Sequence, residues 1–159
     1  MKPWSDLSAE EPEIAELGRK LLFRSREHVG LAFIATLRKD GAPRLHPISP
    51  VICKDHLYVM IPLTSPKCAD LIRDARYALQ AYPPLHNEEN EEFYMAGCAS
   101  RIKDPTIRQS LIDNTKVVAE ENEILFELLI ERAMYTKLVN RGTPDEHPIH
   151  RKWRASSTV

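Results

Sequence analysis

The junction at residues 58–73, YVMIPLTSPKCADLIR, carries the side chains best suited to binding chemistry, because a strand-like segment there passes into a helix-like one. Thr64 and Ser65 supply hydroxyl groups, and Lys67 falls in the first turn of the expected helix. A helix N-terminus offers unpaired N–H groups and about half a positive charge. Together these donors predict a phosphate-binding site. The alternative is that Ser65 only caps the helix and Lys67 is solvated.

Two more polar residues lie one strand earlier along the chain. Arg44 and His46 are two positions apart in an extended segment, so their side chains project from the same face. If this strand pairs with the strand that ends at Thr64, Arg44 reaches the same anion. The alternative is that both are polar residues on a strand that faces solvent.

Catalytic and metal-binding residues are harder to assign. His46 or Tyr58 could donate a proton, but structural roles are favoured for both, and the catalytic residues stay unassigned. His147 and His150 have a spacing found in metal sites, but they stand in a Pro-containing loop with few other ligands, so no metal site is expected. The three cysteines form no CxxC pair and are interpreted as buried or half-buried thiols.

The composition excludes several classes of protein. The 159 residues are 43% hydrophobic and 28% charged, which is typical of one globular domain. A net charge of -1 with neutral histidines provides no basic field for nucleic acid. No apolar run approaches the ~20 residues of a membrane span, and the acidic N-terminal segment has no signal-peptide core. We therefore expect a cytoplasmic protein that binds neither nucleic acid nor membrane.

The elements that must position the polar residues follow from periodicity and turn signals. Ser8 and Glu11 form a capping box at the first helix. Helices are expected at residues 8–28, after Ser65, at 104–118 and at 121–133. Strands are expected at residues 30–41, 42–55, 56–62, 76–82, 92–102 and 134–140, with a last extended segment at 150–155.

Turn residues refine this pattern. Asp40-Gly41 predicts a tight hairpin, because both positions of a primed turn take positive φ. Three prolines in the second strand predict that it is bulged or lies at an edge, and the first three strands would form an antiparallel meander. Gly97 in the fifth strand predicts a bulge or a close backbone approach. The fold class is α+β, an antiparallel six-stranded sheet that closes on itself with helices at its rim.

The order of these segments resembles the pyridoxamine 5′-phosphate oxidase-like family of FMN-binding split barrels. The similarity lies in the hairpin GLAFIATLRKDGAPRLHPISPV, the Ser-x-Lys turn, the strand RYALQAY and the strand AGCAS before an Asp-Pro helix. It covers residues 30–110. The resemblance implies one split-barrel domain over residues 1–159, with an N-terminal helix at 8–28, a barrel core at 30–103, helices at 104–133 and C-terminal strands at 134–155.

The same resemblance implies where FMN would bind. Its phosphate would be held by Arg44, Thr64, Ser65 and Lys67. The isoalloxazine would lie along Leu45, His46, Pro47, Ile48, Met60 and Ile61, with Gln80 reaching it from the next strand. The resemblance also implies a homodimer with the cofactor at the subunit interface, where Trp153 of the partner chain would contribute an aromatic ring. The alternative for Trp153 is ordinary packing.

The function implied is that of an FMN-dependent oxidoreductase acting on a small substrate that the sequence does not identify. The segments RLHPISPV and HPIHRKWRA match the arginine-rich substrate segments of pyridoxamine phosphate oxidases only in part, so that substrate is not expected. The alternative is a non-catalytic protein that binds or senses flavin, the deazaflavin F420 or haem. Candidate haem ligands are His46, His86, His147 and His150.

Overall fold

The computed structural model describes residues 1–24, 29–83 and 90–156. The helices are α1 (Trp4–Glu10), α2 (Pro12–Leu22), α3 (Pro66–Arg73) and α4 (Pro105–Thr115). The strands are β1 (Ala32–Leu37), β2 (Pro43–Ile48), β3 (Val51–Cys53), β4 (His56–Pro62), β5 (Arg76–Ala81), β6 (Glu91–Ile102), β7 (Glu123–Val139) and β8 (His147–Arg154). No helix of the described ranges is long and apolar enough to cross a membrane.

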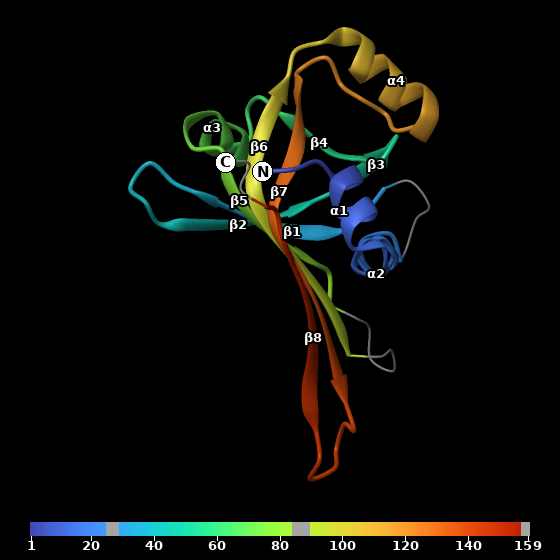
Figure 1. Ribbon diagram of the computed structural model, residues 1–159. Helices are drawn as coiled ribbons and strands as arrows, with labels where there is room; N and C mark the ends of the chain where they lie inside the picture. Colours follow the sequence, from blue (N-terminus) through green and yellow to red (C-terminus); the bar gives the residue numbers. More distant parts are fainter. Residues whose placement is uncertain (25–28, 84–89, 157–159) are drawn as a thin grey trace.

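The strands form one antiparallel sheet with the order β2-β1-β5-β6-β7-β4-β3 (Figure 1). β4 pairs with the first half of β7, and β8 pairs with its second half, so that the β7–β8 ribbon projects away from the helices. The end strands β2 and β3 are joined by residues 49–50 alone, which requires the sheet to curl. The sheet has eight strands, and among the described residues β2 does not pair with β3, so the expectation of a closed six-stranded barrel was wrong in both respects.

The expected helix at residues 121–133 is instead part of β7, which runs for 17 residues. The pairing of β7 with β6 passes from Arg132 to Ile130, leaving Glu131 as a bulge opposite Gly97. Even-numbered residues such as Ile130 face the main core before the bulge, and odd-numbered residues such as Ala133 face it afterwards. Leu125, on the other face, packs in a second cluster under α4. Because the core-facing positions change from even to odd and both faces carry apolar residues, the apolar residues of this strand have the spacing of a helix. This is why the sequence predicted a helix here.

The single helix expected at residues 8–28 is two helices, α1 and α2. Pro12 occupies the first turn of α2. Its missing N–H group costs no hydrogen bond there, because the first N–H groups of a helix have no partner within the helix, and the chain changes direction at Glu11. Ser8 lies inside α1, so the predicted capping box was wrong. Residues 25–28 of that expected helix are outside the described part of the chain. Trp4 of α1 is fully buried and meets Phe93 edge-on, with ring centroids 6.0 Å apart.

The segment expected as one strand at residues 42–55 divides at Pro50 into β2 and β3, which lie at opposite ends of the sheet. The predicted meander was therefore wrong. The hairpin after β1 is confirmed, but only Gly41 of its turn has positive φ (83°). The primed turn joins β3 to β4 instead, where Lys54 and Asp55 have φ values of 49° and 57°.

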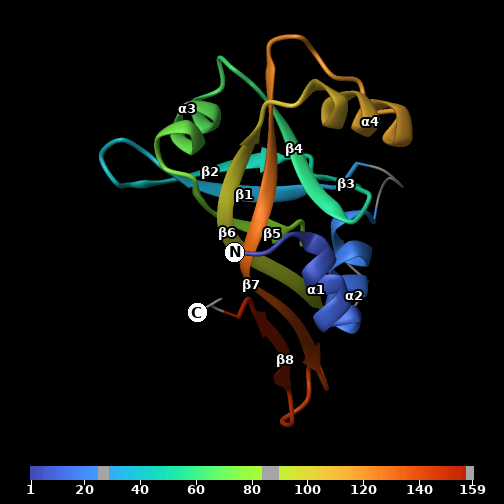
Figure 2. The same cartoon turned by 45° about the horizontal axis from the view of Figure 1, so that its top comes forward.

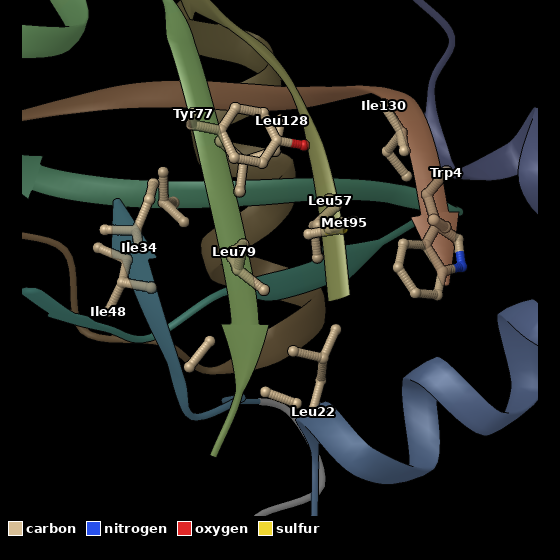
Figure 3. Close-up of a cluster of buried hydrophobic side chains, with 14 of the residues drawn as sticks. Trp4, Leu22, Ile34, Ile48, Leu57, Tyr77, Leu79, Met95, Leu128 and Ile130 are labelled. Atoms are coloured by element: carbon tan, nitrogen blue, oxygen red, sulfur yellow. The ribbon is translucent and has the colours of Figure 1, made fainter. Parts of the chain in front are cut away.

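The main core fills the inner face of the curled sheet and is covered by α1, α2 and α3 (Figures 2 and 3). Ile34, Leu57 and Leu79 project into it from three different strands and are at most 1% exposed. Side chains along each strand alternate between faces, so the residues between them face outward. This alternation decides which candidate site residues can meet.

Candidate functional site

The start of α3 retains free donors. Ser65 is the N-cap residue, with extended backbone (φ -73°, ψ 132°), but its side chain makes no capping hydrogen bond. Its carbonyl instead accepts from the N–H of Cys68 at 2.9 Å. Pro66 takes the first helical position, as the sequence predicts. Thr64 is exposed beside it, so both hydroxyl groups remain available to a ligand.

Lys67 carries a charge that its surroundings do not neutralise. Its Nζ donates to the carbonyl oxygen of Pro47 at 3.4 Å, and within the described ranges it pairs with no carboxylate. Burial lowers the pKa of Lys67, which means that desolvation of the ammonium group is uncompensated. An anion placed between Lys67 and Ser65 would remove that penalty. The contact with Pro47 also shows that the turn after β4 lies next to β2.

Arg44 reaches α3 through a buried acid rather than through strand pairing. Its Nε donates to Oδ2 of Asp70 at 2.7 Å, and Arg73 donates to Oδ1 at 3.0 Å. The hydroxyl of Thr36 donates to Oδ2 at 3.0 Å, and Asp70 is only 3% exposed. Because β2 pairs with β1, the expectation that it pairs with the strand ending at Thr64 was wrong.

Asp70 and Thr36 were not among the predicted site residues. The available signal was the position of Asp70 on the buried face of α3, between Cys68 and Leu71. An acid at such a position needs a cationic partner, and Arg44 supplies one. The consequence for binding is that Arg44 is held in place by Asp70, with only its Nε engaged among the described contacts.

We expect Asp70→Asn to lower the free energy of unfolding by about 2 kcal/mol at pH 7, because it leaves two part-exposed arginines without their acid. Burial alone would raise the pKa of Asp70, but hydrogen bonds from Arg44, Arg73 and Thr36 outweigh it and lower that pKa. The stabilisation is thus present above the ordinary aspartate pKa of about 3.9 and lost as the pH falls through the lower folded-state value. Urea unfolding at several pH values measures this, and an equal difference between variant and wild type at every pH would contradict it.

His46 lies opposite Ile34 of β1, and the charges of both Lys67 and Arg44 act on it. Its Nε2 is buried and has no hydrogen-bond partner in the described structure. Burial, followed by the positive charges of Lys67 and Arg44, lowers the pKa of His46. The imidazole is therefore held neutral, with one ring nitrogen unused.

A cavity of about 460 Å³ lies between the β1–β2 turn and α3. Its cationic lining residues are Arg38, Lys39, Arg44 and Arg73, and its acidic ones are Asp40 and Asp70. Arg44 is the predicted phosphate ligand on its wall, whereas Thr64, Ser65 and Lys67 are not part of the lining. The predicted anion site is thus a turn at the edge of this cavity rather than its floor.

The strand residues predicted to follow the flavin ring divide between two faces. Arg44, His46 and Ile48 face inward, whereas Leu45 and Pro47 face outward, and Leu45 is 67% exposed. On the outer face Pro47 and Gln80 both pair with Phe33 of β1, so the three residues form a row across three strands. Of the β4 pair, Met60 is half-buried on the outer face and Ile61 is fully buried in the core.

Trp153 lies far along the sheet from α3, in β8 opposite Ala133. It is 7% exposed and packs in the main core of its own chain. Its indole N–H donates to Glu10 of α1 at 2.9 Å. A contact between Trp153 and the cofactor of a second subunit stays a prediction.

The C-terminal histidines do not share a site. His147 and His150 are three positions apart on β8, so their side chains leave opposite faces of the strand. His150 bonds the hydroxyl of Thr136 at 3.0 Å, and His147 contacts the carbonyl of Asp145 at 2.8 Å. His86 lies outside the described residues.

No protein-family model matches the sequence, and no curated protein matches it. Solved structures do match the fold. The haem-binding protein of Mycobacterium smegmatis superposes with a TM-score of 0.62 at 13% identity, over 87% of this chain but only 57% of that one. HutZ, the haem storage protein of Vibrio cholerae, superposes with a TM-score of 0.54 at 17% identity, over 76% of this chain and 89% of HutZ. An F420 reductase superposes with a TM-score of 0.53 at 15% identity, over 73% of this chain and 95% of the reductase.

The fold is α+β, with a mostly antiparallel sheet that is split-barrel-like. At these identities the similarity extends to the architecture alone. The curl of the sheet, with β2 and β3 at its two ends, brings the turn after β4 beside β2. The ligand must be inferred from the residues gathered there.

Proposed function

We propose that this split barrel binds FMN by its phosphate at the start of α3 and acts as an oxidoreductase on a small organic substrate. The observation that carries the proposal is the uncompensated charge of Lys67 beside the free hydroxyl of Ser65 at a helix N-terminus. Arg44, held by Asp70, supplies a second cation next to that turn. These donors fit a doubly charged phosphate ester.

β2 is an end strand, so a ligand anchored at this turn can pass around that edge to the outer sheet face, which suits a flat aromatic ring. Phe33, Leu45 and Pro47 offer an apolar surface there, and Gln80 adds one amide in the same row. When bound, FMN would supply the hydride or electron transfer, and the chain would supply orientation and electrostatics. His46, kept neutral, can accept or donate one hydrogen bond without adding charge.

A homodimer belongs to the same proposal. The outer face that would hold the ring is open to solvent at Leu45, and such a face is stabilised when a second copy covers it. A separate apolar cavity of about 350 Å³, lined by Tyr94, Met134 and Trp153 among others, lies on β6, β7 and β8. Its wall could receive the partner or its cofactor.

Haem binding is the second candidate, and His46 is the observation that favours it. Neutral imidazole is the form that ligates iron, and Nε2 of His46 has no partner among the residues described. Two of the structures with this fold are named as haem-binding or haem storage proteins. Against it, that nitrogen is buried, so iron could reach it only after the side chain moves.

The deciding experiment is an absorbance spectrum of the purified protein, followed by heat release and mass measurement of the ligand. We expect a yellow protein that releases FMN. An intense haem absorption band would support the second candidate. Release of a deazaflavin would keep the anion site but replace the cofactor, and failure to bind added FMN, F420 or haem would overturn the proposal.

A further inference from the structure

A second group of reactive side chains lies at the opposite end of β4 from the anion turn. β4 has seven residues, so the two places are separated by roughly 20 Å. There, a cavity of about 510 Å³ opens between the β3–β4 hairpin and α4. Its walls include Cys53, His56, Tyr58 and Glu127, and the proposed flavin chemistry uses none of them.

Strand pairing places a thiol, an imidazole and a carboxylate in sequence on one face. Cys53 and His56 are direct partners across the two-residue turn, which puts their Cβ atoms about 5 Å apart. Nδ1 of His56 lies 2.5 Å from Oε1 of Glu127, which comes from β7. A proton on Nδ1 satisfies the carboxylate, so that Nε2 is left as an acceptor.

The surroundings hold this array in place, with His56 accessible and Cys53 only 7% exposed in the wall of the cavity. Asp55 in the turn is bound by Arg19 of α2 at 2.9 Å, which anchors the hairpin. The ring of His56 stacks on Tyr58 with centroids 6.1 Å apart, and the His56 side chain is 38% exposed. The thiol of Cys53 makes only a long contact of 4.0 Å, to the carbonyl oxygen of Ser110 in α4.

The walls of the cavity select the type of reaction. The hydroxyl of Thr106 already donates to Asp104 at 2.7 Å, and Ser110 presents a carbonyl oxygen. The α4 wall therefore offers acceptors rather than the donor pair that acyl transfer requires for its oxyanion. Exchange between a thiol and a disulfide needs no such donors, because its leaving group is itself a thiolate.

We propose that Cys53 is the reactive thiol of a thiol–disulfide exchange site, in which a low-molecular-weight disulfide occupies the cavity and His56, held by Glu127, accepts the thiol proton. The Cys53 sulfur attacks one sulfur of the disulfide, a new S–S bond forms, and the original S–S bond breaks. The departing thiolate takes the proton from His56. Cys53 is oxidised to a mixed disulfide, and the small disulfide is reduced to one thiol and that adduct.

The titratable groups that face Cys53 are Lys54, His56, Tyr58 and Glu127, since α4 contributes only Thr106, Ile107 and Ser110 to the cavity. Burial, followed by the charges of Glu127 and Cys53, raises the pKa of Tyr58 to about 12. Tyr58 therefore stays neutral near pH 7, and His56 is the group placed to accept the proton of the Cys53 thiol.

The test uses the intact purified chain, hydroxyethyl disulfide as the probe, and mass spectrometry to follow each cysteine. We expect Cys53 to react first because His56 lies beside it, ahead of Cys98, which is more exposed than Cys53, and of Cys68, which is fully buried. His56→Gln and Glu127→Gln should each lower the rate at pH 7 at least about three-fold.

Cys98→Ser is the matched control and should leave the Cys53 rate unchanged. The proposal is overturned if Cys98 or Cys68 reacts as fast as Cys53, or if His56→Gln keeps the wild-type rate and pH profile. Should the variants not fold, the order in which the three cysteines of the wild-type chain react still decides. Flavin binding is measured separately and does not enter either outcome.

Discussion

Replacing Lys67 with alanine should weaken FMN binding about ten- to a hundred-fold. A hydrogen bond between charged partners contributes about 1.5–3 kcal/mol, and each 1.4 kcal/mol corresponds to about ten-fold in affinity. We expect Lys67 to contribute a free energy of this size because no carboxylate pairs with it in the described structure. Its ammonium group is desolvated, and a bound anion would compensate for that desolvation. Fluorescence titration of the apoprotein with FMN measures the effect.

Riboflavin, which lacks the phosphate, provides the sharpest control for this prediction. Wild-type protein should prefer FMN to riboflavin, and Lys67→Ala should reduce that preference while leaving riboflavin affinity nearly unchanged. Lys103→Ala removes an exposed lysine next to α4 and should leave both affinities unchanged. If Lys67→Ala retained full FMN affinity, the start of α3 would not be the phosphate site.

The largest effect on folding is expected for Gly97→Ala, which should lower the free energy of unfolding by about 4 kcal/mol. A Cβ atom on Gly97 would lie 1.9 Å from the carbonyl oxygen of Leu129 and 2.9 Å from its carbonyl carbon. Both are backbone atoms of β7, so neither can rotate away. The close approach occurs where Glu131 bulges, and relief of the clash would disturb the register of the two longest strands. Urea unfolding measures the loss.

Gly142→Ala is the matched control for Gly97→Ala. Gly142 has positive φ (76°), but a Cβ there would meet no atom within 4 Å. The expected cost is about 1 kcal/mol, from the left-handed backbone alone. A Gly97 variant as stable as the Gly142 variant would show that β6 and β7 can separate at the bulge without loss.

The parts of the fold that could be predicted are those with local signals. β4, β5, β6 and the helices α3 and α4 lie close to their expected positions, because proline, N-cap residues and period-two alternation act over a few residues. The bulge at Gly97 also followed from one residue. β7 could not be predicted in the same way, because its alternation changes phase at Glu131 and depends on a partner strand about thirty residues away.

The same difference between local and long-range signals applies to the residues of the candidate site. Ser65 and Lys67 are neighbours in sequence, and the structure keeps them together at a helix start. The link from Arg44 to this helix runs through Asp70, which no local pattern identifies as its partner. The division of the β2 residues between two faces did follow from alternation, but the sequence could not show which face the sheet would bury.

The separation of β2 from β3 has a consequence for how the chain assembles. The β1–β2 and β3–β4 hairpins are contacts of low sequence separation and can form early, yet only two residues connect them and they do not pair with one another. β4 gains its second neighbour only when β7 is available, more than sixty residues later. A chain emerging from the ribosome would thus carry an incomplete sheet until β7 has been synthesised, and its core cannot close before then.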